Sequence, residues 1–175
     1  MSADALTRAP VASASLECPA LFGKLPGHGD FISRGVPGAL RAPFDQWLSD
    51  WLAAAHEALG ADFVEAYETA APWLYHSPRA AAVLLPSVDA VGRQFPLLAV
   101  TVPEVPLQST YDALVDAVSA GSDSDALRAA LGALSPVEAA ATPPVPQWFL
   151  PEGAPPCLPK PDSVPSWPLV EGCFV

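Results

Sequence analysis

The strongest pattern of apolar and polar positions lies in APFDQWLSDWLAAAHEALG, residues 42–60. Its large apolar residues recur at the spacing of one helical face, and they are Phe44, Trp47, Leu48, Trp51, Leu52, Ala55 and Leu59. The charged residues of this segment fall largely on the other faces, and Gly60 stands where a C-terminal cap belongs. The spacing therefore predicts a long helix with its two tryptophans in the core, followed by a short helix over 61–70.

After Pro72 the pattern changes from helical spacing to continuous apolar runs. RAAAVLLPS and QFPLLAVTV have the length of strands and are separated by the turn-like SVDAVGR, and a shorter run at 20–24 predicts a first strand. Continuous apolar runs are typical of strands that are covered on both faces, and such strands need helices on each side. Helical spacing returns at Ser109, a candidate N-cap, and again after Ser122 or Asp123. The pattern favours a layered α/β domain.

The end of the chain has a different character. Eleven of the last 41 residues are proline, a density that excludes a long helix or central strands. Large apolar side chains are nevertheless present in this segment, and they are Trp148, Phe149, Leu150, Trp167, Leu169 and Phe174. We therefore divide the chain into a flexible tail (1–18), an α/β domain (19–135) and a Pro-rich segment (136–175). We expect the Pro-rich segment to wrap around the domain, dock its aromatic residues and add an edge strand.

Composition and charge narrow the classes of function. The 175 residues are 51% hydrophobic and 15% charged, and 19 acids against 8 bases give a net charge of −11. Such a surface repels phosphate backbones, so we expect no nucleic-acid partner but a basic or mixed protein surface. The sequence shows neither a secretory signal nor an apolar run long enough to span a membrane. Its three widely spaced cysteines indicate reduced thiols, so we expect a cytoplasmic protein.

The segment LFGKLPGHGDFISRG, residues 21–35, has the composition of a phosphate-binding loop or a catalytic turn. A Walker loop requires lysine after its second glycine, whereas here Gly23-Lys24 comes first and Leu25 follows. A G-x-G-x-x-G motif starting at Gly27 fails because Ile32 occupies the position of the last glycine. A turn shaped by glycine and proline is the favoured interpretation.

Other catalytic and metal-binding patterns are also missing from the sequence. The three histidines, His28, His56 and His76, form no recognised ligand spacing, even with Asp30 beside the first. There is no G-x-S-x-G motif, and Ser87 follows a strand and a proline, where serine usually makes a turn hydrogen bond. We therefore expect neither a metal nor another cofactor, and no catalytic residue.

Five charged residues remain as candidates for a function, and they are Lys24, Asp30, Arg34, Asp89 and Arg93. They either form ion pairs that lock the loops, such as Asp30 with Arg93, or contact a partner. We predict that the two loops meet in space, with Asp30 or Asp89 within salt-bridge distance of Arg34 or Arg93. The alternative is an enzyme of unknown class with a site formed by loops 23–35 and 86–97.

Two long motifs resemble the signatures of the TagF family, also called ImpM. FGKLPGHGDFISRG fits a pattern G-K-L-P-x-x-G-D-F-x-x-R, and PSVDAVGRQFPL fits P-S-x-D-x-V-G-R-x-F-P-L. Trp47 and Trp73 also fall where the family carries tryptophans, and the resemblance covers about residues 20–135. Near the C-terminus, where family members often carry a tryptophan-rich motif, only PQWF and PSWPL approximate it.

This resemblance implies an α/β fold, a three-layer α-β-α sandwich around a mixed or antiparallel sheet, with the Pro-rich C-terminal wrap added. It implies a cytoplasmic, non-enzymatic protein that represses the assembly or activity of the type VI secretion system after translation, by protein binding. The partner implied is a forkhead-associated-domain scaffold protein of the threonine-phosphorylation pathway.

Overall fold

A single antiparallel sheet forms the centre of the molecule in the computed structural model, which describes residues 14–137 and 145–175. The strands are β1 (Ala20–Gly23), β2 (Ile32–Arg34), β3 (Trp73–His76), β4 (Ala81–Leu85), β5 (Leu97–Thr101) and β6 (Gln147–Phe149), in the spatial order β2-β1-β5-β4-β3-β6. Every neighbouring pair is antiparallel. The central strands β4 and β5 are buried along their whole length, as their continuous apolar sequences predict.

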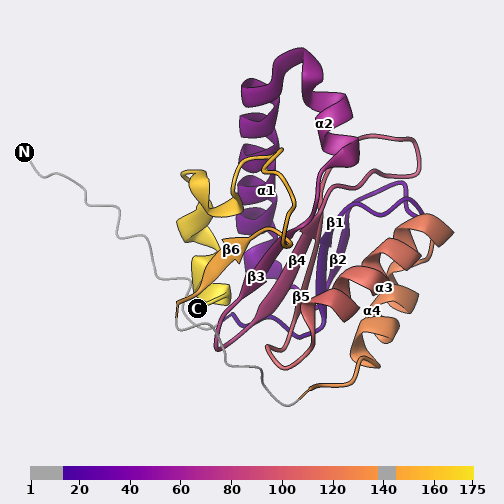
Figure 1. Cartoon of the computed structure of the whole chain (residues 1–175). Coiled ribbons are helices and arrows are strands. Elements are labelled where there is room, and N and C mark those ends of the chain that lie inside the picture. The colour runs from indigo at the N-terminus through magenta and orange to yellow at the C-terminus, as the bar shows by residue number, and fades with distance from the viewer. Residues whose placement is uncertain (1–13, 138–144) are drawn as a thin grey trace, which may run out of the picture.

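Helices cover both faces of this sheet, so the expected three-layer α-β-α sandwich is confirmed (Figure 1). One face carries α1 (Gly38–Leu59), and the other carries α3 (Leu107–Ala120) and α4 (Ser124–Gly132). The end of α1 and α2 (Phe63–Thr69) extend beyond the sheet, joined by a 3-10 turn (Gly60–Asp62). The core under α1 is rich in aromatic residues, whereas the core under α3 and α4 is mainly aliphatic.

Helix α1 begins four residues earlier than the sequence pattern indicated. Its first buried residue, Leu40, continues the apolar face of Phe44 and Trp47 by one turn, and all three are almost fully buried. Pro43 lacks a backbone N–H, which weakens the hydrogen bonding of the first turns. The packing of this apolar face stabilises the helix in spite of that loss. The predicted cap at Gly60 is confirmed, since this residue has a φ of 52°.

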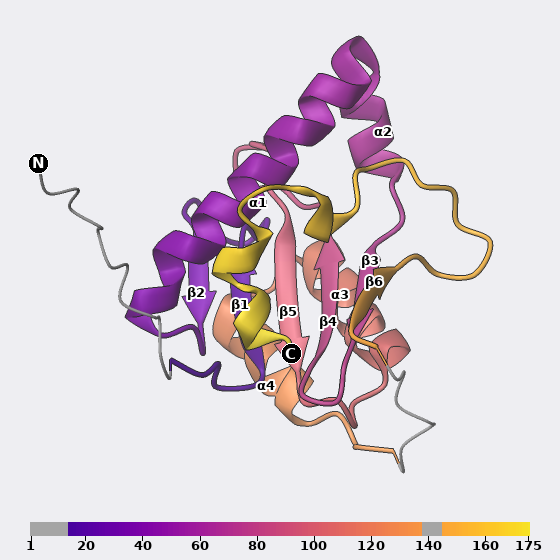
Figure 2. The ribbon, with the colours of Figure 1, turned by 90° about the vertical axis from the view of Figure 1, so that its left-hand side faces the viewer.

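The C-terminal strap, residues 145–175, docks on the α1 face. It begins with the edge strand β6 and ends in three 3-10 helices, Pro161–Ser163, Trp167–Leu169 and Glu171–Cys173. Figure 2 shows these turns beside α1 across the sheet. The indole of Trp47 donates to the carbonyl of Pro161 (2.8 Å) and that of Trp51 to Pro159 (2.7 Å). The expected Pro-rich wrap with an edge strand is therefore present.

Three local expectations need correction or restriction. Helix α3 begins at Leu107, and Ser109 is not its cap, because the helical bonding already starts with Thr110 donating to Pro106. Strand β2 lies inside the segment that we expected to be only a loop. Most of the predicted flexible tail, residues 1–13, lies outside the described residues, while Ala14 and Leu16 at its end pack against the aromatic core. No described helix is long and apolar enough to cross a membrane.

Candidate functional site

The two motif loops lie side by side at one end of the sheet. Residues 24–31 connect β1 to β2, and residues 86–96 connect β4 to β5 (Figures 1 and 2). Both loops leave the sheet at the same point, since Gly23 at the end of β1 pairs with Leu97 at the start of β5. A Cβ atom on Gly23, whose φ is 127°, would collide with the carbonyl of Pro96, so only glycine permits this approach. The prediction that the loops meet is confirmed.

A buried carboxylate joins the loops. Oδ2 of Asp89 lies 2.9 Å from Nζ of Lys24 and 2.6 Å from Nε of Arg93. Its Oδ1 accepts the backbone N–H groups of Val91 (3.0 Å) and Arg93 (2.9 Å). Nη2 of the same arginine donates to the carbonyl of Gly29 (2.8 Å) in the other loop. We call Lys24, Asp89 and Arg93 the Asp89 lock.

The lock keeps its carboxylate ionised although Asp89 is only 2% exposed. Burial is the largest single influence on the pKa of this carboxyl and would raise it. The hydrogen bonds from Arg93, Lys24 and Val91 together outweigh burial and hold the pKa well below its ordinary value. A carboxylate stabilised in this way is a weak base.

The remaining two charged candidates do not join the lock. Asp30, which we expected to pair with Arg93, is exposed and forms no ion pair within the described part of the chain. Its expected place is taken by Asp89, which lies four residues from Arg93 in the same loop. Arg34 instead pairs through Nε with Asp125 of α4 at 2.6 Å, and both side chains are substantially exposed. The prediction that Asp30 or Asp89 lies within salt-bridge distance of Arg34 or Arg93 is confirmed by the pair of Asp89 with Arg93.

His28 connects three segments at this end of the molecule. Its backbone N–H donates to Leu25 (2.9 Å) and its carbonyl accepts from Ala90 (2.9 Å). Its ring nitrogen Nε2 accepts the N–H of Ser124 (2.9 Å), the first residue of α4. A ring nitrogen that accepts an N–H uses its lone pair for this bond, so the contact ties the 24–31 loop to the start of α4. Within residues 14–137 and 145–175, no group of three or more metal-ligating side chains gathers, here or elsewhere.

Loop 86–96 is also tied to the end of α2. The hydroxyl of Tyr67 donates to the carbonyl of Ser87 (3.1 Å) and accepts its N–H (3.1 Å). Burial raises the pKa of this tyrosine, because its phenolate would be desolvated. Ser87 itself is 4% exposed, and its hydroxyl is directed to the neighbouring carbonyl of Val88 (3.5 Å). This contact agrees with a serine in a turn.

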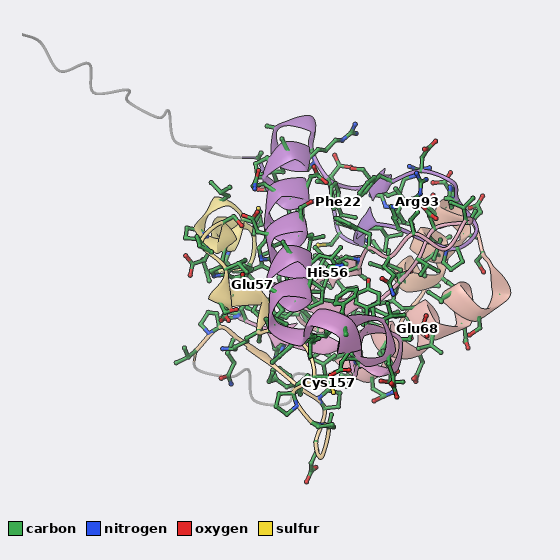
Figure 3. All side chains as sticks on the ribbon, turned by 90° about the horizontal axis from the view of Figure 1, so that it is seen from above. Phe22, His56, Glu57, Glu68, Arg93 and Cys157 are labelled. Carbon is green, nitrogen blue, oxygen red and sulfur yellow. The ribbon has the colours of Figure 1, made fainter. Side chains whose placement is uncertain are left out.

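Above the lock, the two loops expose apolar side chains. Phe31 is 47% exposed and Val91 is 74% exposed. The ring of Phe31 packs edge-on against Phe95, with centroids 4.6 Å apart, and Nζ of Lys24 lies 5.3 Å from its centroid. We call six exposed residues of the two loop tips the loop crown, and they are Asp30, Phe31, Ala90, Val91, Gly92 and Arg93. Figure 3 shows Arg93 at the rim of the molecule, away from α1.

Sequence reasoning found the charged residues of this site but missed its apolar surface and its histidine. Phe31 directly follows Asp30, and Val91 lies between Asp89 and Arg93, two positions from each, in a Gly-containing turn; those positions were the available signal of exposure. His28 gave no such signal, because its partner Ser124 is 96 positions away.

Comparisons with known proteins agree with the two motifs. A family profile described as TagF N-terminal domain, Type VI secretion system-associated, matches residues 20–141. Among solved structures, the chain is similar to the crystal structure of PA0076 from Pseudomonas aeruginosa PAO1, with a TM-score of 0.52 and 28% sequence identity. The similarity covers 73% of this chain and 64% of that one. A comparison with curated proteins gave no significant match.

Proposed function

Because this chain belongs to the TagF N-terminal domain family and is thus a type VI secretion system-associated protein, we propose that it restrains the assembly or activity of the secretion apparatus after translation. It does so by binding a protein, without catalytic turnover. The observation that carries this mechanism is the Asp89 lock, in which Lys24 of one motif and Asp89 and Arg93 of the other are engaged with one another and with the backbone.

The chemistry of the lock supports binding over catalysis. A general base needs a pKa near the working pH, whereas the hydrogen bonds to Asp89 outweigh the effect of burial and leave this carboxyl far more acidic than that. Lys24 donates to the same carboxylate and lies beneath the ring of Phe31. Groups held in this way fix the shape of two loops, and a fixed loop surface is what a binding protein requires.

The family resemblance supplies the partner that we propose, a forkhead-associated-domain scaffold protein of the secretion system. The net charge of −11 favours rapid encounter with a basic surface on that partner, and the association rate should fall as salt is raised. We place the binding in the cytoplasm. The free state of Cys18, Cys157 and Cys173 supports this, since reduced thiols are typical of that compartment.

Graded expression in a host with an intact apparatus tests this function. Secretion of the tube protein should fall in proportion to the ratio of this chain to the scaffold, and deletion of the gene should raise it at constant transcript levels. Binding without turnover requires roughly equal copy numbers for full restraint. Full restraint at a small fraction of the scaffold's copy number would instead favour the enzyme alternative at loops 23–35 and 86–97, and unchanged secretion in all strains would contradict any regulatory role.

A further inference from the structure

The loop crown combines exposure with the residue types that dominate protein interfaces. Phe31 is the one aromatic residue among the large exposed apolar side chains of residues 14–137 and 145–175, and Val91 is the most exposed of them. They come from different motif loops, yet the backbone bond from Ala90 to His28 (2.9 Å) joins those loops directly. Aromatic and arginine side chains are enriched at the centres of interfaces, and Arg93 completes the crown.

The crown is held rigidly from below. Val91 projects from a turn whose backbone N–H groups at Val91 and Arg93 are both bound to Oδ1 of Asp89. The turn is closed by Gly92 donating to the carbonyl of Asp89 (2.9 Å), with a φ of 82°. An apolar side chain on a turn that is already ordered loses little entropy when a partner covers it.

Arg93 also retains capacity for a second acceptor. Its Nε is bound to Asp89 and its Nη2 to Gly29, while Nη1 has no acceptor in the described part of the chain. The side chain is 62% exposed although it is anchored. A guanidinium fixed in this way is ready to bind a carboxylate with its free edge.

We propose that the loop crown is the surface through which this chain binds its protein partner, an inference that rests on the proposed function. The partner presents an apolar recess that receives Val91 and Phe31, with a carboxylate at its rim that meets Nη1 of Arg93. Long-range attraction between the acidic chain and a basic partner brings the two together, and this local match sets the orientation.

Titration calorimetry with the purified forkhead-associated scaffold protein tests this assignment. Val91→Asp should weaken binding by roughly tenfold or more, because it places a charge in the recess and beside the carboxylate. Val91→Lys should weaken binding less than Val91→Asp, because a cation is compatible with a carboxylate at the rim. The control is Val102→Asp, at a 43% exposed valine that follows β5 and therefore lies at the opposite end of that strand. It should bind like the wild type.

The outcomes separate this inference from the function on which it rests. Wild-type binding that Val91→Asp leaves unchanged overturns the crown while the regulatory function stands. A greater loss for Val91→Lys than for Val91→Asp overturns the carboxylate at the rim. If Val102→Asp loses as much binding affinity as Val91→Asp, then any added negative charge disturbs binding, and this overturns the crown as well. Absence of wild-type binding removes the proposed partner and the crown assignment with it. Thermal unfolding of each variant confirms that the compared proteins are folded.

Discussion

The aromatic cluster under the C-terminal strap and the Asp89 lock both join segments that are distant in the sequence, but they do so by different physics. In the aromatic cluster, formed by Trp47, Tyr75, Trp148, Trp167 and Phe174, the centroids of contacting rings lie 5.1–6.3 Å apart. Such contacts gain free energy from buried apolar area and need little directional precision. The Asp89 lock gains its specificity from directed bonds to one carboxylate.

The difference separates stability from shape. A buried ion pair contributes little net stability, because the desolvation of its charges offsets much of their attraction. Burial of five large aromatic rings contributes a great deal. The cluster therefore holds the sandwich together, while the lock sets the positions of the loops that carry the crown.

The largest expected effect is in the cluster. Trp47→Ala should lower the free energy of unfolding by about 3–5 kcal/mol, because it leaves a cavity and removes the bond to Pro161. Chemical denaturation measures this loss. The neighbouring Gln46→Ala, at an exposed position of the same helix, should change it by less than about 0.5 kcal/mol. A loss below about 1 kcal/mol for Trp47→Ala would show that this face does not carry the core.

The next effect is in the lock. Asp89→Asn should lower the Tm by roughly 3–12 °C, because Lys24 loses the counter-charge beside its buried ammonium group. The matched control is Asp30→Asn in the other loop, which should shift the Tm by about 1 °C or less. Equal shifts in the two variants would contradict a special role for Asp89.

Acid should weaken the same site. The pKa of Asp89 in the folded protein lies below its ordinary value, so the carboxylate's contribution is present above about pH 4 and is lost as the pH falls toward the folded-state pKa. The Tm of the wild type should therefore fall more steeply below about pH 4 than that of Asp89→Asn. Parallel Tm curves for the two proteins would argue against the lowered pKa.

Alkali should act on the cluster instead. Burial is the main cause that raises the pKa of Tyr75 to about 12, and the hydroxyl of this residue donates to the carbonyl of Phe174 (3.2 Å). Because the folded-state pKa is raised, the contribution of the Tyr75 hydroxyl to stability is fully present below about pH 10. It is lost as the pH rises through the folded-state pKa. Tyr75→Phe should flatten this alkaline loss. The measurements are tyrosinate absorbance and Tm across the same pH range. An alkaline fall in Tm that is equally steep in Tyr75→Phe and the wild type would contradict this prediction.

The smallest effect is expected at the exposed pair of Arg34 and Asp125. Arg34→Ala should cost at most about 1 kcal/mol, because solvent and salt screen a pair whose side chains are 36% and 73% exposed. Denaturation at low and high salt measures the cost, which should shrink as salt is added. A larger loss of unfolding free energy that does not depend on salt would show that this pair is shielded from solvent, like the Asp89 lock.

The sequence predicted the parts of the fold that depend on local periodicity. The face of Phe44, Trp47 and Trp51 repeats at 3.6 residues, and the runs that became β4 and β5 are apolar except for Thr101 at the end of β5. The strap was predictable because proline excludes regular structure while Trp148 and Trp167 still require burial. The start of α1 was misplaced because tertiary packing of Leu40 overrides the local effect of Pro43.

The site was only partly predictable, because most of its bonds span long sequence distances. The motifs predicted that the two loops meet and which charged residues are candidates. They did not predict which of these charged residues pair with one another. Lys24 and Asp89 are 65 positions apart, and Arg34 and Asp125 are 91 apart. Composition alone cannot distinguish Asp30 from Asp89 as the buried acid. Only the backbone of the turn, with two N–H groups directed at one carboxylate, makes that distinction.

The central claim is that a stable core presents the loop crown as a rigid binding surface. Complementation of a host that lacks this gene tests it most directly. The measurement is the amount of tube protein secreted when Val91→Asp or Val102→Asp is expressed at wild-type level. Because both valines are exposed, at 74% and 43%, both variants should remain folded. We predict that Val102→Asp restrains secretion like the wild type and that Val91→Asp does not. Full restraint by Val91→Asp would show that the loop crown is not the binding surface.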